Sequence, residues 1–450
     1  MSRLSFTLAT LAVAACDQGG KPATAPSLPP TAEVAEAAPA PAAPVPKPRP
    51  VAYTPAPGPA YLGVDGAGLF RLDDGALTRL VAHAYPIRHI AIDPRGAIYA
   101  TAIGGLWKIV DGRVERLGRG IGLDPERIAV GPDGVLWTTD RRSVSRWDGT
   151  WTDEPAATFD GELINDLAVD RDGRVWVVQS AALWRLDGDH WAKVDLGFLG
   201  AKEPYLQAIA LHADGSVYLT GLPGTYAFRD GRWSEAGLGS RYGSVDELVA
   251  GPAGHVAASG GVGTLAVQAP TGAVRTVELS DGPAQARRGD VLAIDGAGRA
   301  WLATDNGLVI FDRDGGLAQQ WLPGTVAGVT GKITAVTTVG DGPRLPTLTT
   351  AATGAITGTV LRKGQRIAGA TVELCDTPLT MFRKTPCESS TRSYRATTAA
   401  DGSFRIADVP VGSYGFAVKP AAQWIILIGS NCCTDLVAGG SYDVGSITLD

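Results

Sequence analysis

Four side chains with acidic, basic or cationic chemistry stand at equivalent places along this 450-residue chain. They are His89, Arg127, Asp166 and Glu247, and each directly precedes an apolar residue in one copy of a repeated segment. A carboxylate, an imidazole and a guanidinium that meet in one place are the ingredients of a ligand-binding or catalytic site. These four residues are therefore the candidate site, provided that the fold brings them together.

The segments that carry these residues belong to a sevenfold repeat. Each copy starts with a short apolar run and ends at a glycine, and the copies occupy 87–96, 125–134, 164–173, 206–215, 245–254, 290–298 and 333–342. The terminal glycines follow one another at 38, 39, 42, 39, 44 and 44 residues. A period of about 40–45 residues made of short alternating strands is the signature of β-propeller blades.

The repeat also predicts how the ring of blades closes. A complete copy, such as 87–118, contains four strand-like runs separated by turns, with Asp-Gly as a hairpin signal. Residues 60–80 contain three such runs without a first strand, and 333–342 contain a first strand with no others after it. The sequence thus predicts an all-β fold with a seven-bladed propeller at 60–342. Its last blade combines one strand from the C-terminal side with three from the N-terminal side.

Three stretches resemble known propeller families. Residues 99–106 (YATAIGGL) and 301–308 (WLATDNGL) resemble the repeats of two-component-regulator propellers, and 131–137 (GPDGVLW) resembles streptogramin-lyase propellers. The resemblance covers about 60–342. It implies the fold and no single function, because such blades serve sensors, enzymes and scaffolds alike.

A second domain follows a linker at 343–353. Turn and strand patterns at 358–360, 368–372, 401–404 and 409–414 resemble those of carboxypeptidase-regulatory-like domains. The resemblance implies a small prealbumin-type β-sandwich at 354–450 without peptidase chemistry. A polar insertion at 376–396 departs from the family pattern.

Four of the five cysteines, Cys375, Cys387, Cys432 and Cys433, lie in this second domain. In an exported chain cysteines form disulfides by default. Because adjacent cysteines are awkward to bond, we expect Cys375 and Cys387 each to pair with one of Cys432 and Cys433. The alternative is a metal site, but the domain has no histidine and no zinc-type spacing, so we predict no metal and no cofactor.

The N-terminus predicts export and a lipid anchor. Arg3 precedes an apolar stretch that is too short to span a bilayer and fits a signal peptide at 1–15. The stretch ends in Val-Ala-Ala before Cys16, which resembles the bacterial lipobox and implies Cys16 as the lipid attachment site. The alternative is an ordinary signal peptide with Cys16 incidental. Residues 16–59 are rich in Ala and Pro, which predicts a disordered tether.

We therefore expect an extracytoplasmic protein anchored to the bacterial cell membrane, with the inner or outer membrane left open. The net charge of −6 and the absence of a basic run exclude nucleic acid as a natural partner. An envelope protein or glycan is the expected partner.

In propellers the starts of the innermost strands generally face the mouth of a central channel, so the four candidate residues are expected to converge in one funnel. The residues one place earlier are all polar: Arg88, Glu126, Asn165, Gln207, Asp246, Asp290 and Thr334. Alternatively the funnel holds only water, and Arg127–Asp166 and His89–Glu247 neutralise one another.

These observations predict a non-catalytic binding or scaffold protein that recognises a protein, peptide or glycan of the cell envelope. One alternative is a propeller enzyme of the lyase or lactonase type with its site in the funnel. Another is a structural surface protein without a small ligand.

Overall fold

The computed structural model describes most of the chain beyond residue 52. The described residues are 53–118, 125–154, 159, 161–199, 205–222, 224–238, 245–260, 263–279, 289–304, 307–329, 331–349, 353–375, 384–388, 390, 392–410, 414–432, 436 and 439–449. Only the backbone is described at 222, 289, 290 and 428–432. The predicted signal peptide, Cys16, the tether up to residue 52, and Cys433 lie outside the described residues.

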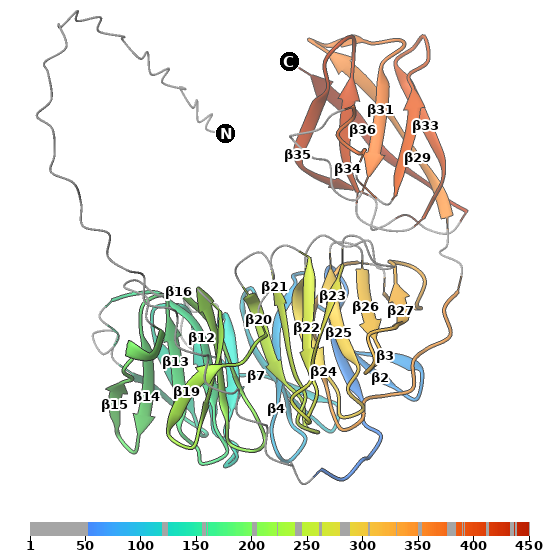
Figure 1. The fold of residues 1–450 in the computed structure, drawn as a ribbon. Coiled ribbons are helices and arrows are strands. Elements are labelled where there is room, and N and C mark those ends of the chain that lie inside the picture. The colour runs from blue at the N-terminus through green and yellow to red at the C-terminus, as the bar shows by residue number, and fades with distance from the viewer. Residues whose placement is uncertain are drawn as a thin grey trace, which may run out of the picture. The chain divides into compact units, whose positions relative to one another are not determined.

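Residues 60–338 form repeated four-stranded antiparallel sheets, an arrangement that fits a β-propeller (Figure 1). Seven such sheets are present among the described residues of this region. In the order of their first strands they are β4 (Ile87–Ile92), β5 (Ile98–Ala102), β6 (Gly105–Val110), β7 (Arg113–Arg116); β8 (Arg127–Val130), β9 (Leu136–Thr139), β10 (Val144–Trp147), β11 (Trp151–Glu154); β12 (Ile164–Val169), β13 (Val175–Gln179), β14 (Leu183–Asp187), β15 (His190–Lys193); β16 (Tyr205–Leu211), β17 (Val217–Leu222), β18 (Thr225–Arg229), β19 (Arg232–Glu235); β20 (Val245–Ala250), β21 (Val256–Gly260), β22 (Thr264–Gln268), β23 (Val274–Glu278); β24 (Gly289–Ile294), β25 (Ala300–Thr304), β26 (Gly307–Phe311), β27 (Leu317–Trp321); and β28 (Ile333–Thr338), β1 (Ala60–Val64), β2 (Gly68–Asp73), β3 (Ala76–Val81).

Burial changes across each sheet from the first strand to the fourth. The second strands β5, β13 and β25 are buried at every residue, whereas β7 is exposed throughout. Neighbouring sheets pack face to face, as where Leu265 of β22 meets Leu302 and Phe311 of the next sheet in one hydrophobic cluster. The continuous apolar runs of the second strands follow from this burial on both faces.

The glycine that ends each of the first six repeats forms the turn between the first and second strands, and Gly342 ends the turn that follows β28. All seven of these glycines have φ between 70° and 90°, the left-handed region that side chains disfavour. In the first copy the amide of Gly96 donates to the carbonyl of Asp93 at 3.0 Å, which closes the turn. The repeat therefore has a glycine at a regular interval because each copy needs this backbone conformation at the same place.

The seven first strands contact one another in a closed cycle. Each of them contacts the first strand of the next sheet, and β28 contacts β4. The cycle closes because β28 pairs antiparallel with β1, with Val336 opposite Leu62. The seventh sheet therefore combines one strand from 333–338 with three strands from 60–81.

Residues 53–59, which the sequence assigned to the tether, lie against the end of the last repeat. The amide of Val339 donates to Pro59 O at 2.9 Å and the amide of Asp341 donates to Ala56 O at 2.8 Å. The hydroxyl of Tyr53 donates to Asp341 Oδ1 at 2.8 Å. The predicted tether boundary was thus too late, because these backbone hydrogen bonds hold 53–59 in place.

Residues 353–449 form two further four-stranded sheets that enclose one hydrophobic core. Phe404, Phe416, Val372 and Ile356 contribute to this core. The first sheet contains β29 (Thr353–Arg362), β30 (Gln365–Arg366), β33 (Ser403–Pro410) and β36 (Ser441–Leu449), with β29 and β36 parallel; the second contains β31 (Thr371–Cys375), β32 (Ser393–Thr397), β34 (Tyr414–Lys419) and β35 (Ile425–Cys432).

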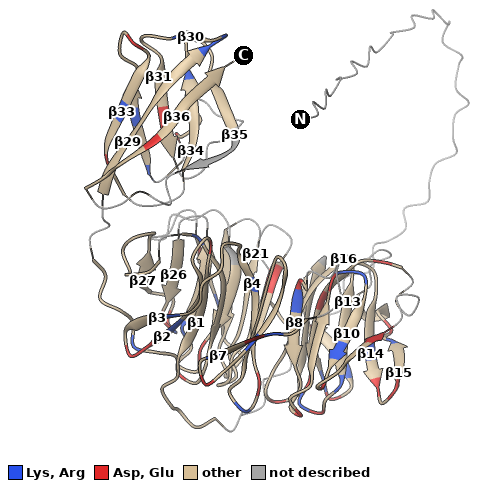
Figure 2. Ribbon diagram, turned by 180° about the vertical axis from the view of Figure 1, so that it is seen from behind, with Lys and Arg blue, Asp and Glu red and all other residues tan. Residues whose placement is uncertain are grey.

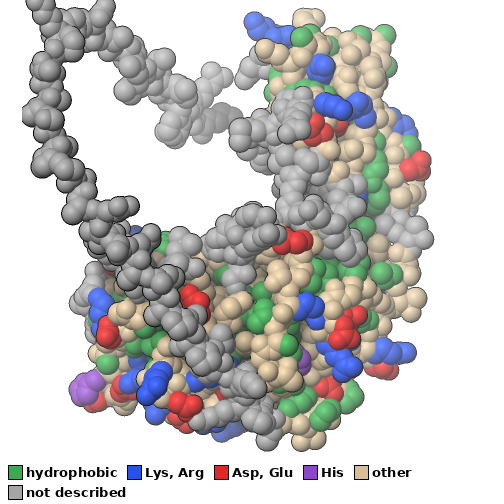
Figure 3. Space-filling model, viewed as in Figure 1, with side chains coloured by type: hydrophobic (Ala, Val, Ile, Leu, Met, Phe, Trp, Pro, Cys, Tyr) green, Lys and Arg blue, Asp and Glu red, His purple; other side chains and the backbone are tan. Residues whose placement is uncertain are grey.

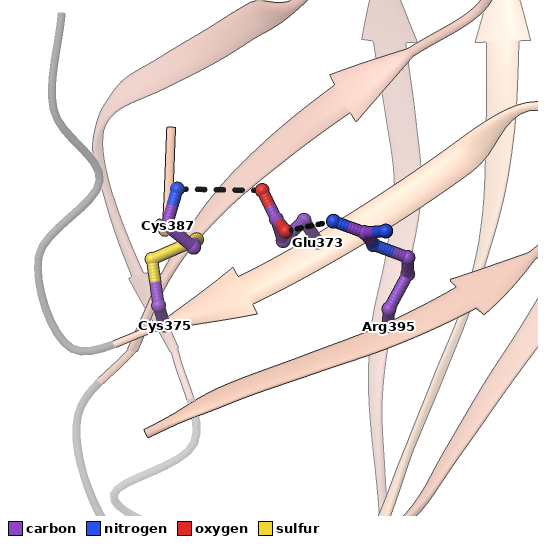
Figure 4. The surroundings of a disulfide bond; sticks show 4 residues. All are labelled: Glu373, Cys375, Cys387 and Arg395. Atoms are coloured by element: carbon purple, nitrogen blue, oxygen red, sulfur yellow. Dashed lines mark hydrogen bonds and ion pairs between the residues drawn. A yellow bond between two sulfur atoms is a disulfide. The ribbon is translucent and has the colours of Figure 1, made fainter. Parts of the chain in front are cut away.

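The predicted disulfide pairing is wrong, because Cys375 bonds to Cys387 (Figure 4). Their Cα atoms are 5.8 Å apart. Cys432 lies on β35, which is separated from β31 by β34, so two strand spacings of about 4.8 Å each put it beyond the reach of Cys375. The buried carboxylate of Glu373 accepts from the amide of Cys387 at 3.3 Å and from Arg395 at 2.6 Å.

Helix contributes little to the described residues. The element η2 (Gly197–Leu199) is a single turn of 3-10 helix. No described segment forms a helix with the length and apolar character needed to cross a membrane. On the face shown in Figure 3, hydrophobic side chains are interspersed with charged ones, as on protein surfaces generally.

Residues 343–349, predicted as part of the linker, are bonded to the preceding sheets. The amide of Thr349 donates to Thr325 O at 3.0 Å, and Gln319 donates to Pro346 O at 3.0 Å. Leu345 packs on the cluster that contains Trp321. The unit that closes the ring therefore extends to residue 349.

A chain ended at residue 330 lacks β28 and should melt well below a chain ended at residue 349. Ile333, Ala335 and Val336 are buried, so the loss of β28 removes several kcal/mol and should lower the Tm by roughly 10 °C or more. Scanning calorimetry of both chains measures this difference. Equal melting temperatures would show that β28 does not close the ring.

Candidate functional site

The seven first strands surround a central cavity of about 580 Å3. It extends along these strands from Pro86 and Glu126 at their N-terminal ends to Leu211 and Ala250 at their C-terminal ends. The volume falls in the range of about 300–1,000 Å3 that small-molecule sites occupy. All four residues predicted from the sequence line this cavity: His89 on β4, Arg127 on β8, Asp166 on β12 and Glu247 on β20.

A β-bulge precedes the candidate position in six of the seven first strands. In β4, for example, Ile87 pairs with Ala102 and His89 pairs with Thr101, so Arg88 is the extra residue. The same shift leaves out the following residues: Asn165, Gln207, Asp246, Asp290 and Thr334. A bulge frees backbone groups and re-aims the side chains around it, which explains why every residue at this place is polar.

Arg127 reaches across the centre of the ring. Its Nη2 donates to Oε1 of Glu247 at 2.9 Å, and β8 and β20 are three steps apart in the cycle of seven first strands. The Nε atom of Arg127 lies 3.9 Å from Oδ1 of Asp166. The charge of Glu247 is the main cause that raises the pKa of Arg127 above its ordinary value. The guanidinium is therefore permanently charged in the cavity.

Asp166 joins two neighbouring sheets through both of its carboxylate oxygens. Oδ2 accepts from the amide of Ile209 on β16 at 3.0 Å, and Oδ1 accepts from the amide of Leu167 at 2.9 Å. Burial raises the pKa of Asp166 to about 6, although Arg127 and both amides oppose this shift. The carboxyl group is thus held in place by backbone donors and titrates close to neutral pH.

His89 is a neutral imidazole beside the cavity. Burial, together with the positive charge of Arg127, lowers its pKa to about 3. Its Nδ1 is buried without a hydrogen-bond partner among the described residues, as is Oγ1 of Thr101, the residue opposite it. The predicted pairing of His89 with Glu247 is not formed between these described side chains, because Glu247 bonds to Arg127 instead.

Two charged residues outside the four candidates, both at the polar position one place earlier, also line the cavity. Arg88 and Glu126 form an ion pair of 3.6 Å at the N-terminal ends of β4 and β8, and Arg141 lies 3.5 Å from the same carboxylate. The sequence feature that points to Arg88 and Glu126 is the polar residue that directly precedes each candidate residue. Asn165, from the same position, instead donates to Leu206 O at 2.7 Å and so links two sheets.

Apart from Thr334, the remaining part of the lining is aliphatic. Val291 of β24 and Ala335 of β28 occupy the positions equivalent to the four charged or polar candidates, and Leu292 and Val336 lie beside them. Among the residues that the structure describes, no three His, Cys, Asp or Glu side chains are grouped so that they could hold a metal ion. One side of the cavity, lined by β4, β8, β12 and β20, therefore carries charged or polar candidates, and the side lined by β24 and β28 carries aliphatic residues at the equivalent positions.

No protein-family model matches the chain, and no curated protein matches its sequence. Among solved structures the chain is similar to virginiamycin B lyase from Staphylococcus aureus in complex with quinupristin. That match has 14% identity and a TM-score of 0.44, and it covers 52% of this chain and 83% of the lyase.

A gluconolactonase from Xanthomonas campestris is 18% identical, with a TM-score of 0.38, and YCF48 from Cyanidioschyzon merolae is 12% identical, with a TM-score of 0.42. Each of these two matches covers 58% of this chain and 96% of the other. Likeness at such identities carries no functional assignment.

The lowered pKa of His89 predicts a specific loss of stability in acid. In the unfolded chain His89 takes up a proton near its ordinary pKa of 6.5, whereas in the native state it stays neutral down to about pH 3. The contribution of the neutral, buried His89 to the free energy of unfolding is thus complete above pH 6.5 and is lost as the pH falls toward 3. Between pH 7 and 5, wild type should lose about 1–2 kcal/mol of unfolding free energy relative to His89→Gln.

Urea denaturation at several pH values measures this difference. His190→Gln is the matched control, because it makes the same substitution at an exposed histidine outside the cavity. Parallel pH profiles for wild type and His89→Gln would contradict a neutral, buried His89.

Proposed function

We propose that the protein is a binding protein of the cell envelope, with a ligand site in the central channel of a seven-bladed β-propeller. In this proposal the propeller spans 60–342, and the blade of β28, β1, β2 and β3 closes it. Residues 354–450 form a small β-sandwich. Cys16 carries the lipid that anchors the chain to the bacterial cell membrane on its extracytoplasmic side.

The observation that carries the proposal is the incompletely bonded group of polar side chains in the cavity. Arg127 has five N–H donors, and one of them is hydrogen bonded to a side chain among the described residues. In the same part of the chain Glu247 uses one carboxylate oxygen for this bond, and Nδ1 of His89 has no hydrogen-bond partner. Such groups satisfy their remaining capacity with water or with a ligand, so a polar ligand can replace water without breaking the protein's own contacts.

The charges of the cavity indicate which ligands fit. Arg88 and Arg127 face Glu126, Asp166 and Glu247, so positive and negative groups nearly balance. Along the strands and turns coloured in Figure 2, basic and acidic residues are interspersed. This balance favours a neutral or dipolar ligand over a polyanion such as nucleic acid.

Catalysis in the same cavity is the second candidate function. The observation that favours it is the presence, in one cavity, of a neutral imidazole on β4 and of a carboxyl group with a pKa of about 6 on β12, two steps away in the cycle of first strands. A carboxyl group of this pKa suits general acid–base chemistry near neutral pH, and a neutral imidazole can accept a hydrogen bond from the substrate. In that case the ligand would be converted, as by a lyase or a lactonase, rather than retained.

The anchor is tested by Cys16→Ala. The substituted chain should appear in the soluble periplasmic or secreted fraction, because it lacks the thiol that would carry the lipid. Immunoblots of fractionated cells measure this distribution. Retention of Cys16→Ala in the membrane fraction would contradict the anchor.

The site is tested with immobilised full-length chain lacking its lipid and incubated with an envelope extract. A solute should be retained by wild type and lost with Arg127→Met and with Glu247→Gln, because each removes one half of the ion pair. Arg71→Gln is the control, since the exposed side chain of Arg71 on β2 pairs with the exposed Asp73, outside the cavity. Mass spectrometry identifies the retained solute.

Identical retention by all four chains would contradict the proposed site. Consumption of the solute by wild type, with release of a product, would replace binding by catalysis.

A further inference from the structure

The cavity has opposite charges fixed side by side next to an aliphatic wall. Arg127 and Glu247 are 2.9 Å apart at the centre of the ring. Following the first strands from β20 through β24 to β28, the equivalent positions change from Glu247 to Val291 and Ala335. Three features of a ligand are thus specified together: an anionic group, a cationic group close to it, and an apolar group.

We propose that this cavity binds an α-amino acid with an aliphatic side chain, its carboxylate on Arg127 and its ammonium group on Glu247. This inference rests on the proposed function and names the ligand class of the same site. In an α-amino acid a single carbon carries the carboxylate, the ammonium group and the side chain, so the three groups are as close together as the three features of the cavity.

The ion pair leaves room for both charged groups of the ligand. The bond from Nη2 of Arg127 to Oε1 of Glu247 leaves the other guanidinium donors and Oε2 of Glu247 available. Hydrogen bonds between charged groups are about twice as strong as neutral ones, and guanidinium binds carboxylate in a bidentate manner. The head group of an amino acid would therefore extend the ion pair into a four-membered charge network.

A ligand with only one charge fits less well. An anion alone would meet the nearby carboxylates of Asp166 and Glu247, and a cation alone would meet Arg127. Like charges in a partly desolvated site repel one another and are costly to leave unpaired. A dipolar head group places each charge next to its opposite.

The aliphatic wall selects the side chain of the ligand. Val291, Leu292 and Val336 line this part of the cavity. Burial of an aliphatic side chain the size of Leu contributes about 1.5–3 kcal/mol. A hydrophilic side chain against Val291, Leu292 and Val336 would lose its hydration without gaining a hydrogen bond from these three side chains.

Titration calorimetry of the full-length chain with four probes tests the inference. The probes are leucine, leucinamide, which lacks the anion, N-acetylleucine, which lacks the cation, and glucose. Leucine should bind, and leucinamide and N-acetylleucine should each bind at least about 10-fold more weakly, since each loses one charge-assisted contact. Glucose should not bind.

Variants of Glu247 and Arg127 test which of the two side chains binds the ammonium group and which binds the carboxylate. Glu247→Gln should weaken leucine about 10-fold or more but should not weaken N-acetylleucine, whose anion no longer meets the carboxylate of Glu247. Arg127→Met should weaken N-acetylleucine further. Arg71→Gln should bind leucine as wild type does. Circular dichroism confirms that each variant is folded, and Glu247→Gln, which changes one atom, remains decisive if Arg127→Met does not fold.

Equal affinities for leucine and either single-charge analogue would overturn the inference. Binding of glucose without leucine would overturn it in favour of a glycan, and failure of all four probes would overturn it as well. The proposed function fails separately, only if no solute of the envelope extract depends on Arg127 and Glu247 for its retention.

Discussion

The pairing of β28 with β1 is the constraint on which the rest of the molecule depends. The hydroxyl of Thr334 lies within 3.4 Å of Gly63 O, and these two residues are 271 positions apart in the chain. Ordering so long a loop has an entropic cost, which the buried side chains of β28 and β1 offset. Because this pairing closes the cycle of first strands, it also encloses the central cavity. Without it, Arg127 and Glu247 would not be held on opposite sides of one space.

Much of this architecture could be predicted because a repeat translates sequence position into spatial position. Once the terminal glycines set the period, residues at equivalent places had to lie at equivalent places in neighbouring sheets, and so His89, Arg127, Asp166 and Glu247 could be grouped. Which of them bond to one another could not be predicted. The sequence favoured neighbours such as Arg127 and Asp166, whereas a long arginine side chain reaches the opposite side of the ring.

Other errors have local physical causes. The bulges were invisible because an inserted residue leaves no mark other than a polar position, and the extra residues share no single side-chain type. The pairing of Cys375 was misjudged because the argument treated the cysteines as a set and did not consider that the segment after β31 returns to it within twelve residues. Tyr53 was taken as part of a tether, although its hydroxyl bonds to Asp341.

The odd number of first strands in the ring has a consequence for how such a site can change. In a ring of seven, no strand faces another directly, so each one faces the gap between two. From β8, these two strands are β20 and β24, and they carry Glu247 and Val291 at the equivalent position. The guanidinium of Arg127 can therefore pair with an acidic residue on either β20 or β24. An exchange of the residues at 247 and 291 would change the direction of the dipole in the cavity without altering any strand. The ligand specificity of this ring can therefore change when two neighbouring copies of the repeat exchange the residue at one equivalent position.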